Sequence, residues 1–262
     1  MSVDPAGAAL SNDSRMTIWE HLAELRSRLI KVFICVAAAA VLGWIVYPYV
    51  LEFLRRPYCD IQPNCDLLAL DPLEPFTVRL KVSAYIGIAL AMPMILWQVW
   101  RFVTPGLYPH EKRYALPFVL TSLVLFVFGA FLAYVTLNPA LSFLNTIAGG
   151  NIETQYAPDK YITLILYMML AFGAAFEFPV LLVALQLIGV LTPRQLLGWW
   201  RPALVIIAVA AAVITPSQDP ISMLALVLPM TLLYFGSIAI GALVARRKRK
   251  KAARAATPTG AS

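Results

Sequence analysis

The chain has 262 residues, of which 60% are apolar and only 13% are charged. This composition excludes an ordinary soluble domain and indicates an integral membrane protein. The formal net charge is +7, but many of the basic residues follow the last apolar segment directly, which is typical of a cytoplasmic flank that meets anionic lipid. We therefore expect no nucleic-acid partner.

The chain opens with a polar arm, residues 1–16, that lacks an apolar core and is predicted to be a disordered cytoplasmic segment rather than a signal peptide. A helix is predicted from Thr17, because Thr17 and Glu20 form a capping-box pattern. Its apolar stripe has helical spacing and consists of Ile18, Leu22, Leu25 and Leu29. Since an apolar run follows at once, we expect an amphipathic helix at a membrane surface that continues into the first span.

Six apolar segments follow, and each is predicted to be a transmembrane helix, because backbone groups in lipid must satisfy their own hydrogen bonds. They cover residues 29–49, 75–100, 114–137, 161–190, 202–214 and 221–244. The fifth is only about 20 Å long as a helix, short of a bilayer core of about 30 Å, so we expect local bilayer thinning there. The predicted domains are the arm 1–16, a six-helix transmembrane domain 17–245, and a disordered basic tail 246–262.

Lys and Arg are concentrated in both terminal segments and in the connections after the second and fourth spans. The remaining connections hold most of the Asp and Glu residues. Because basic loops stay on the cytoplasmic side, this bias predicts that both termini are cytoplasmic. An even number of spans requires the two termini to share a side as well.

Three cysteines are present. Cys35 lies in an apolar run and is interpreted as packing. Cys59 and Cys65 flank a short polar stretch, and a disulfide between them is predicted if that loop faces an oxidising compartment. They have too few partners for a zinc site, so neither a metal nor a cofactor is expected.

No catalytic set is recognisable, because neither His21 nor His110 has a serine or cysteine partner in a known motif. Two function classes stay open for such a membrane protein, a secondary transporter of a small solute and an intramembrane enzyme. The lack of an internal repeat weighs against the transporter, and the lack of paired polar residues within the spans weighs against the enzyme.

Two cytoplasmic segments resemble signatures of the TatC family, the receptor component of twin-arginine protein translocases. The first is His21-Leu-Ala-Glu-Leu-Arg26. The second covers residues 100–113 and reads Trp-Arg-Phe-Val-Thr-Pro-Gly-Leu-Tyr-Pro-His-Glu-Lys-Arg, similar to the family pattern Trp-x-Phe-x-x-Pro-x-Leu-Tyr-x-x-Glu-[Lys/Arg]-[Lys/Arg]. Residues 176–179 resemble the family's fourth span, and residues 215–220 its last outer loop. The resemblance covers about Thr17 to Val244.

The resemblance implies an all-α fold in which six helices form a concave wall, in a multi-pass protein of the cytoplasmic (inner) membrane with no enzyme activity. It implies a receptor and core subunit that recognises twin-arginine signal peptides and exports folded proteins using the proton-motive force. The implied partners are TatA- and TatB-type single-span proteins and twin-arginine precursor proteins. Anionic lipid is expected at the basic tail, and a homo-oligomer is left open.

The candidate signal-peptide ligands come from these two cytoplasmic signatures, and they are Glu24, Arg26, Phe102 and Glu111. The carboxylates suit adjacent arginines, which pair with them bidentately, whereas lysine offers only a point charge. Arg26 is expected to orient Glu24, and Phe102 to pack against the peptide. In the alternative interpretation Glu24 pairs with Arg28 at i,i+4, and Glu111 sits at the start of the third helix.

Two further acidic residues lie outside these signatures. Glu177 is inside an apolar span, where a carboxylate is costly and usually functional, so it is a candidate for a partner contact or for proton coupling. Its alternative is a protonated side chain bonded to the backbone that Pro179 releases. Asp219 resembles an acidic residue of the family's outer, periplasmic loop, and its alternative is a turn former.

Overall fold

The computed structural model describes residues 18–60, 67–69, 71–103, 115–147, 157–215 and 219–256, and within these ranges the regular elements are all α-helices. Five helices are long and apolar enough to cross a membrane: α1 (Ile18–Cys59), α2 (Glu74–Val103), α3 (Ala115–Ile147), α4 (Pro158–Ile188) and α7 (Pro220–Ala256). The short α5 (Pro193–Gly198) precedes α6 (Trp200–Ile214), a shorter apolar helix at the predicted fifth span. The all-α prediction is confirmed.

Several helices are longer than their apolar runs. α1 continues past residue 49, the predicted end of the first span, to Cys59, with Pro48 and Pro57 inside it. α3 reaches Ile147 rather than residue 137. α7 continues to Ala256, beyond the predicted end of the sixth span at residue 244. Thr17, the predicted start of α1, lies outside the described residues.

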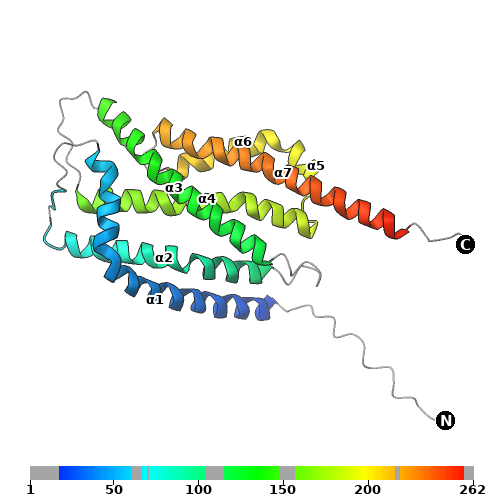
Figure 1. The fold of residues 1–262 in the computed structure, drawn as a ribbon, viewed down its shortest axis with the longest axis horizontal. Helices are drawn as coiled ribbons and strands as arrows, with labels where there is room; N and C mark the ends of the chain where they lie inside the picture. The colour runs from blue at the N-terminus through cyan, green and yellow to red at the C-terminus, as the bar shows by residue number, and fades with distance from the viewer. Residues whose placement is uncertain are drawn as a thin grey trace, which may run out of the picture.

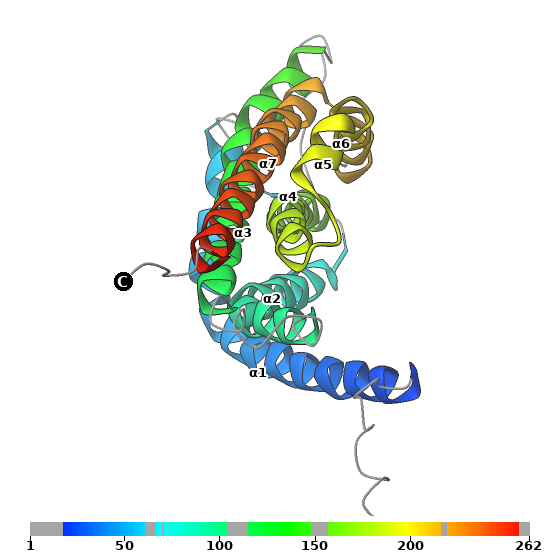
Figure 2. The same cartoon turned by 90° about the vertical axis from the view of Figure 1, so that its right-hand side faces the viewer.

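The first turn of α1 and the last turn of α7 lie at the same end of the bundle (Figure 1). We call this the terminal end; α1 starts there, α2 and α4 finish there, and α7 finishes there. The opposite end, where α1 finishes and where α2, α4 and α7 start, is called the far end. α1 runs beside α2 and then bends across the far end (Figure 1). Seen end on, α1, α2, α3 and α7 follow a curved row, with α4 against its inner side and α5 and α6 at its edge (Figure 2).

α4 is the core of this arrangement, because it contacts α2, α3, α6 and α7. Its most buried side chains recur at helical spacing and are at most 1% exposed: Tyr161, Ile162, Ile165, Met168, Phe172 and Phe176. In lipid the hydrophobic effect does not drive helices together, so close packing of side chains must do so. The large side chains of α4 provide that packing area for the helices around it.

Glycines allow the outer helices to approach one another closely. A Cβ at Gly87 of α2 would lie 2.8 Å from the Val36 carbonyl oxygen of α1, and one at Gly43 would lie 2.7 Å from the Ser83 carbonyl oxygen. Gly129 of α3 likewise faces the backbone of α4. Small residues at such contacts are typical of membrane helices, because they let backbones touch. The glycines thus fix the α1–α2 and α3–α4 spacing.

The first proline of α1 leaves a carbonyl without its helical donor. Pro48 has no N–H, so the carbonyl of Trp44, four residues earlier, cannot be paired within the helix. Nη2 of Arg79 on α2 donates to this oxygen at 3.1 Å. A neighbouring helix therefore satisfies the broken turn, which is how prolines are tolerated within membrane helices.

The second proline is compensated in the same way from two other helices. Pro57 releases the carbonyl of Phe53, which accepts a hydrogen bond from the Tyr134 hydroxyl of α3 at 3.0 Å. The next carbonyl, of Leu54, accepts one from the Tyr161 hydroxyl of α4 at 2.8 Å. The far part of α1 is thereby attached to α2, α3 and α4.

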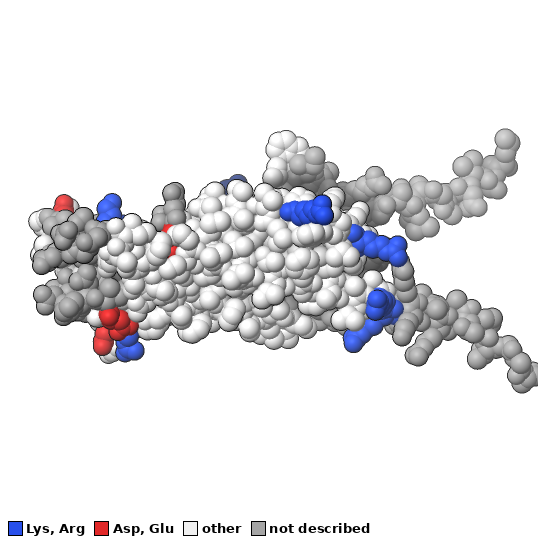
Figure 3. Space-filling model, turned by 90° about the horizontal axis from the view of Figure 1, so that it is seen from above, with Lys and Arg blue, Asp and Glu red and all other residues white. Residues whose placement is uncertain are grey.

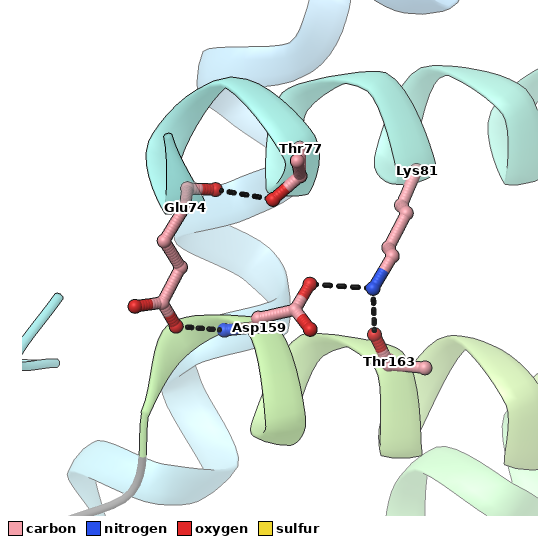
Figure 4. A network of polar contacts seen from close by, with 5 residues as sticks. All are labelled: Glu74, Thr77, Lys81, Asp159 and Thr163. Carbon is pink, nitrogen blue, oxygen red and sulfur yellow. Dashed lines mark hydrogen bonds and ion pairs between the residues drawn. The ribbon is translucent and has the colours of Figure 1, made fainter. Parts of the chain in front are cut away.

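A polar network at the far end fixes the start of α4 (Figure 4). α4 begins without a side-chain cap of its own at Ala157. Glu74, which is 7% exposed at the start of α2, accepts the backbone N–H of Asp159 at 2.8 Å and supplies the missing cap. Nζ of Lys81 bonds to Oδ1 of Asp159 at 2.5 Å and to Oγ1 of Thr163 at 3.3 Å. These contacts hold α2 and α4 in register.

Candidate functional site

At the terminal end, two α1 residues form an ion pair, and a side chain of α2 contacts this pair. Nε and Nη2 of Arg28 both donate to Oε1 of Glu24, and the Nε distance is 3.2 Å. Nη1 of the same guanidinium donates to Oε1 of Gln98 on α2 at 3.3 Å. The Arg28 side chain is 12% exposed and that of Glu24 is 25% exposed. The Glu24 carboxylate is thus held in one orientation at the terminal end.

The structure describes only part of the predicted signal-peptide site. Arg26 is exposed and lines a shallow depression on α1 with Ala23, Ser27, Ile30 and Lys31. The described base beside Glu24 is therefore Arg28 rather than Arg26. Phe102 lies in the last turn of α2, and its side chain is not described. Glu111 lies outside the described residues, so its proximity to Glu24 stays a prediction.

Sequence reasoning missed Gln98, although it is 7% exposed within an apolar span. The amide accepts from Arg28 and also donates to the sulfur of Met94 at 3.8 Å. The available signal was a polar amide between apolar neighbours, since such a group in a membrane helix needs a partner. Only the fold reveals that this partner is Arg28.

Glu177 lies in the middle of α4 and is half-buried, facing α3. The hydroxyl of Ser122 on α3 is its side-chain hydrogen-bond partner. Within the described part of the chain, its Oε1 is buried and has no hydrogen-bond partner. Glu177 is therefore a carboxyl group within the α3–α4 contact, and one of its oxygens makes no described hydrogen bond.

Asp219 caps a helix, as its turn-former interpretation anticipated. It is 2% exposed, and its Oδ1 accepts the backbone N–H of Ser222 at 2.7 Å in the first turn of α7. Pro220 begins that helix, where its missing N–H costs nothing. Any further role of Asp219 stays a prediction.

Cys59 is the last residue of α1, whereas Cys65 lies outside the described residues, so their pairing stays a prediction. Among the described residues, no group of three or more His, Cys, Asp or Glu side chains is placed to hold a metal ion. The polar groups described above instead make contacts between helices or at helix ends.

The comparison with protein families decides the classification. A family model described as "Sec-independent protein translocase protein (TatC)" matches residues 20–229. This chain belongs to the TatC family. The family is a receptor component of a protein translocase and not an enzyme. The match confirms the resemblance to this family that was found in residues 21–26 and 100–113. Family membership and the apolar helices make the chain a multi-pass protein of the cytoplasmic membrane.

Similar proteins cover most of the chain. The TatC protein of Frankia casuarinae is 40% identical over 91% of this chain and 69% of its own length. That of Aquifex aeolicus is 39% identical over 90% of this chain and 98% of its own length. A crystal structure of the twin arginine translocase receptor TatC in the detergent DDM is 39% identical, with a TM-score of 0.74 over 85% of this chain and 99% of that one. These matches confirm the predicted TatC fold.

Proposed function

We propose that this chain, as receptor and core subunit of its translocase, binds twin-arginine signal peptides at its terminal end through Glu24 and Glu111. The supporting observation is the Glu24 carboxylate, oriented by Arg28, which is itself held by Gln98 of α2. α2 ends and α3 begins at this same end, and Glu111 lies in the connection between them (Figure 1).

The chemistry of the two carboxylates favours arginine. A carboxylate offers two oxygens and accepts about four hydrogen bonds in all. A second guanidinium can therefore share the group in a planar fork, which a lysine cannot do. Each charge-assisted contact would contribute roughly 1.5–3 kcal/mol, less where water screens it.

The test is binding of a fluorescent Arg-Arg signal peptide to the chain in lipid nanodiscs. Glu24→Ala and Glu111→Ala should each weaken binding, and the double variant very roughly a hundredfold or more, since about 1.4 kcal/mol is tenfold. Both variants should lose less with a Lys-Lys peptide. Glu52→Ala is the matched control, because Glu52 is an exposed carboxylate in the far part of α1.

Unchanged binding of the Arg-Arg peptide by both single variants would reject the assignment of these two glutamates. An equal loss in Glu52→Ala would point to net charge alone. Substitution of Arg26 and of Phe102 in the same binding assay would show whether these two side chains shape the peptide site.

The single-span partners are proposed to contact the membrane part of the bundle, with Glu177 as a polar contact or a proton-coupling group. Glu177 faces Ser122 between α4 and α3, and an intramembrane carboxylate is costly to retain without a use. Glu177→Ala should weaken transport of a folded precursor or assembly with TatA- and TatB-type proteins, while the protein remains folded. Full transport by this variant would leave only a structural role.

The terminal end is proposed to be cytoplasmic. On the face shown in Figure 3, the visible Asp and Glu side chains lie towards the far end, whereas Lys and Arg also gather at the terminal end. This distribution agrees with the cytoplasmic preference of basic residues. A reporter after Val244 should be cytoplasmic and one near Asn64 external, and the opposite result at either point would refute the orientation.

A disulfide between Cys59 and Cys65 is proposed for the far end, which would then face an oxidising compartment. Its short loop would give a stabilisation of about 2–3 kcal/mol. Mass spectrometry of the unreduced protein should find the two residues linked, and two alkylatable thiols would contradict this.

The basic segment that follows Val244 is proposed to meet anionic lipid. Arg246 and Arg247 are exposed in the last part of α7, beyond the apolar run. Their replacement by glutamine should reduce binding of the solubilised protein to anionic vesicles. A homo-oligomer is the remaining prediction, which mass measurement in detergent would test.

A further inference from the structure

Arg79 on α2 is held against two aromatic rings of α1. Its guanidinium carbon lies 4.4 Å from the centroid of the Trp44 ring and 5.3 Å from that of Tyr47. Nη2 donates to the Trp44 carbonyl at 3.1 Å, and the residue as a whole is half-buried. Cation–π contact and one hydrogen bond thus fix the guanidinium in place without neutralising its charge.

No acidic partner is described for this cation. Among the described residues the ion pairs join Arg28 to Glu24 and Lys81 to Asp159, so Lys81, two residues from Arg79, has a carboxylate and Arg79 has none. A cation in or near a membrane is costly unless an anion compensates its charge, and a lipid headgroup is one source of such an anion.

The position of Arg79 indicates which anion is available. Arg79 lies five residues into α2, about 7.5 Å along the helix from its start at the far end. Phe76 and Leu80 beside it are 57% and 54% exposed, as expected for a surface that faces lipid. Trp and Tyr are enriched at the depth of lipid headgroups, where the abundant anion is a phosphodiester.

We propose that Arg79, Trp44 and Tyr47 form a headgroup site that binds the phosphate of a phospholipid at the far end of the bundle. The guanidinium has five donor N–H groups; one on Nη2 bonds to Trp44 and Nε is buried, so the phosphate would be bound by the remaining N–H groups of Nη1 and Nη2. Because the rings already restrict the side chain, little conformational freedom is lost when phosphate binds. The site goes beyond signal-peptide recognition and does not depend on it.

The test uses the delipidated full chain in detergent, titrated by native mass spectrometry with phosphatidylglycerol, phosphatidylcholine and inorganic phosphate in separate arms. One phosphatidylglycerol should bind most tightly, and Arg79→Gln should weaken it about tenfold, the equivalent of one charge-assisted contact. The affinity of Arg79→Lys for phosphatidylglycerol should lie between those of the unchanged chain and Arg79→Gln, because lysine retains the charge but lacks the planar guanidinium fork.

Arg56→Gln is the matched control, since Arg56 is an exposed cation of α1 towards the same end and has no described aromatic frame. It should change the affinity by less than about twofold, as expected for a screened surface charge. Equal effects of Arg79→Gln and Arg56→Gln would overturn the proposal. So would inorganic phosphate binding as tightly as the lipid, because the site would then recognise a free anion.

A second measurement leaves the sequence unchanged, so it does not depend on the folding of a variant. A phosphatidylglycerol with a photoreactive headgroup is incorporated into membranes that contain the full chain, and its crosslinks are mapped by peptide mass spectrometry. Crosslinks should concentrate in residues 44–47 and 76–80. An even spread over the lipid-facing helices would overturn the site.

Discussion

The two halves of α1 are attached to the protein in different ways. The far half receives hydrogen bonds from three helices, donated by Arg79 of α2, Tyr134 of α3 and Tyr161 of α4. The terminal half has one described side-chain hydrogen bond to another helix, from Arg28 to Gln98 of α2. One helix therefore combines a half that three other helices hold with a lightly attached arm. Here the arm is the terminal half of α1, not residues 1–16, and it carries Glu24.

This difference suits a receptor for an extended peptide. An arm that contacts a single neighbouring helix leaves much of its surface accessible, and Figure 2 shows the start of α1 projecting beyond the row of helices. The anchored half keeps the arm in a constant position relative to the bundle. Substitutions at the contacts of α1 should therefore lower the free energy of unfolding most at the shared α1–α2 contact and least in the arm.

The largest effect is expected for Gly87→Leu, which would separate both halves of α1 from α2. Its Cβ would lie 2.8 Å from the Val36 carbonyl oxygen and 2.9 Å from Cα of Ala40. Overpacking of this kind should lower the free energy of unfolding by about 3 kcal/mol, measured by reversible unfolding in bicelles. Gly236→Leu is the control, because no atom lies within 4 Å of its Cβ position. Equal losses in the two variants would refute a tight α1–α2 contact.

A smaller effect is expected when a donor is removed from the anchored half alone. Tyr161→Phe leaves the Leu54 carbonyl without the hydroxyl that bonds to it at 2.8 Å in a buried site. The free energy of unfolding should fall by about 1.5 kcal/mol, the upper part of the range for the net contribution of one hydrogen bond. Tyr134→Phe should cost less, since its bond to Phe53 is exposed. The reverse order would mean that the Tyr161 bond is not the stronger attachment.

The next effect concerns the single described tie of the arm. Gln98→Leu removes the acceptor for Arg28 at 3.3 Å and replaces a buried amide with an apolar side chain of similar volume. Global stability should change by about 1 kcal/mol or less, while amide hydrogen exchange in the first turns of α1 should increase. Unchanged exchange in these turns would show that α1 is held there by packing instead.

The smallest effect on stability is expected for Glu24→Gln. Its i,i+4 pair with Arg28 is partly exposed, so the free energy of unfolding should change by at most about 0.5 kcal/mol. Peptide binding by the same variant should nevertheless weaken clearly. A large loss of stability would instead assign Glu24 a structural role, and a double-mutant cycle with Arg28→Gln would measure it.

The helices and their local side-chain contacts could be predicted from the sequence. Hydropathy predicts the apolar spans, because lipid leaves the backbone few alternatives to a helix. The spacing of Glu24 and Arg28 predicts their pair, and the turn pattern at Asp219 predicts its contact with the start of α7. In each case the partners lie within four residues of one another, so local geometry is sufficient.

The contacts between helices could not be predicted in this way. Tyr161 and Leu54 are 107 positions apart, and Glu74 and Asp159 are 85 apart. Helix ends were missed for a related reason, since α1 continues through Pro57 only because α3 and α4 supply donors near it. Hydropathy also ends before α7 does, because a basic helix can continue into water.

The prolines of α1 have a consequence for biosynthesis. α1 emerges from the ribosome first, but the donor for Trp44 belongs to α2, and those for Phe53 and Leu54 belong to α3 and α4. Until those helices are made, the carbonyls at the far half of α1 must remain in contact with water, because an unpaired carbonyl in lipid costs several kcal/mol. The bend in α1 would thus form last, and a nascent chain released before α4 should leave this half of α1 accessible to water-soluble labels.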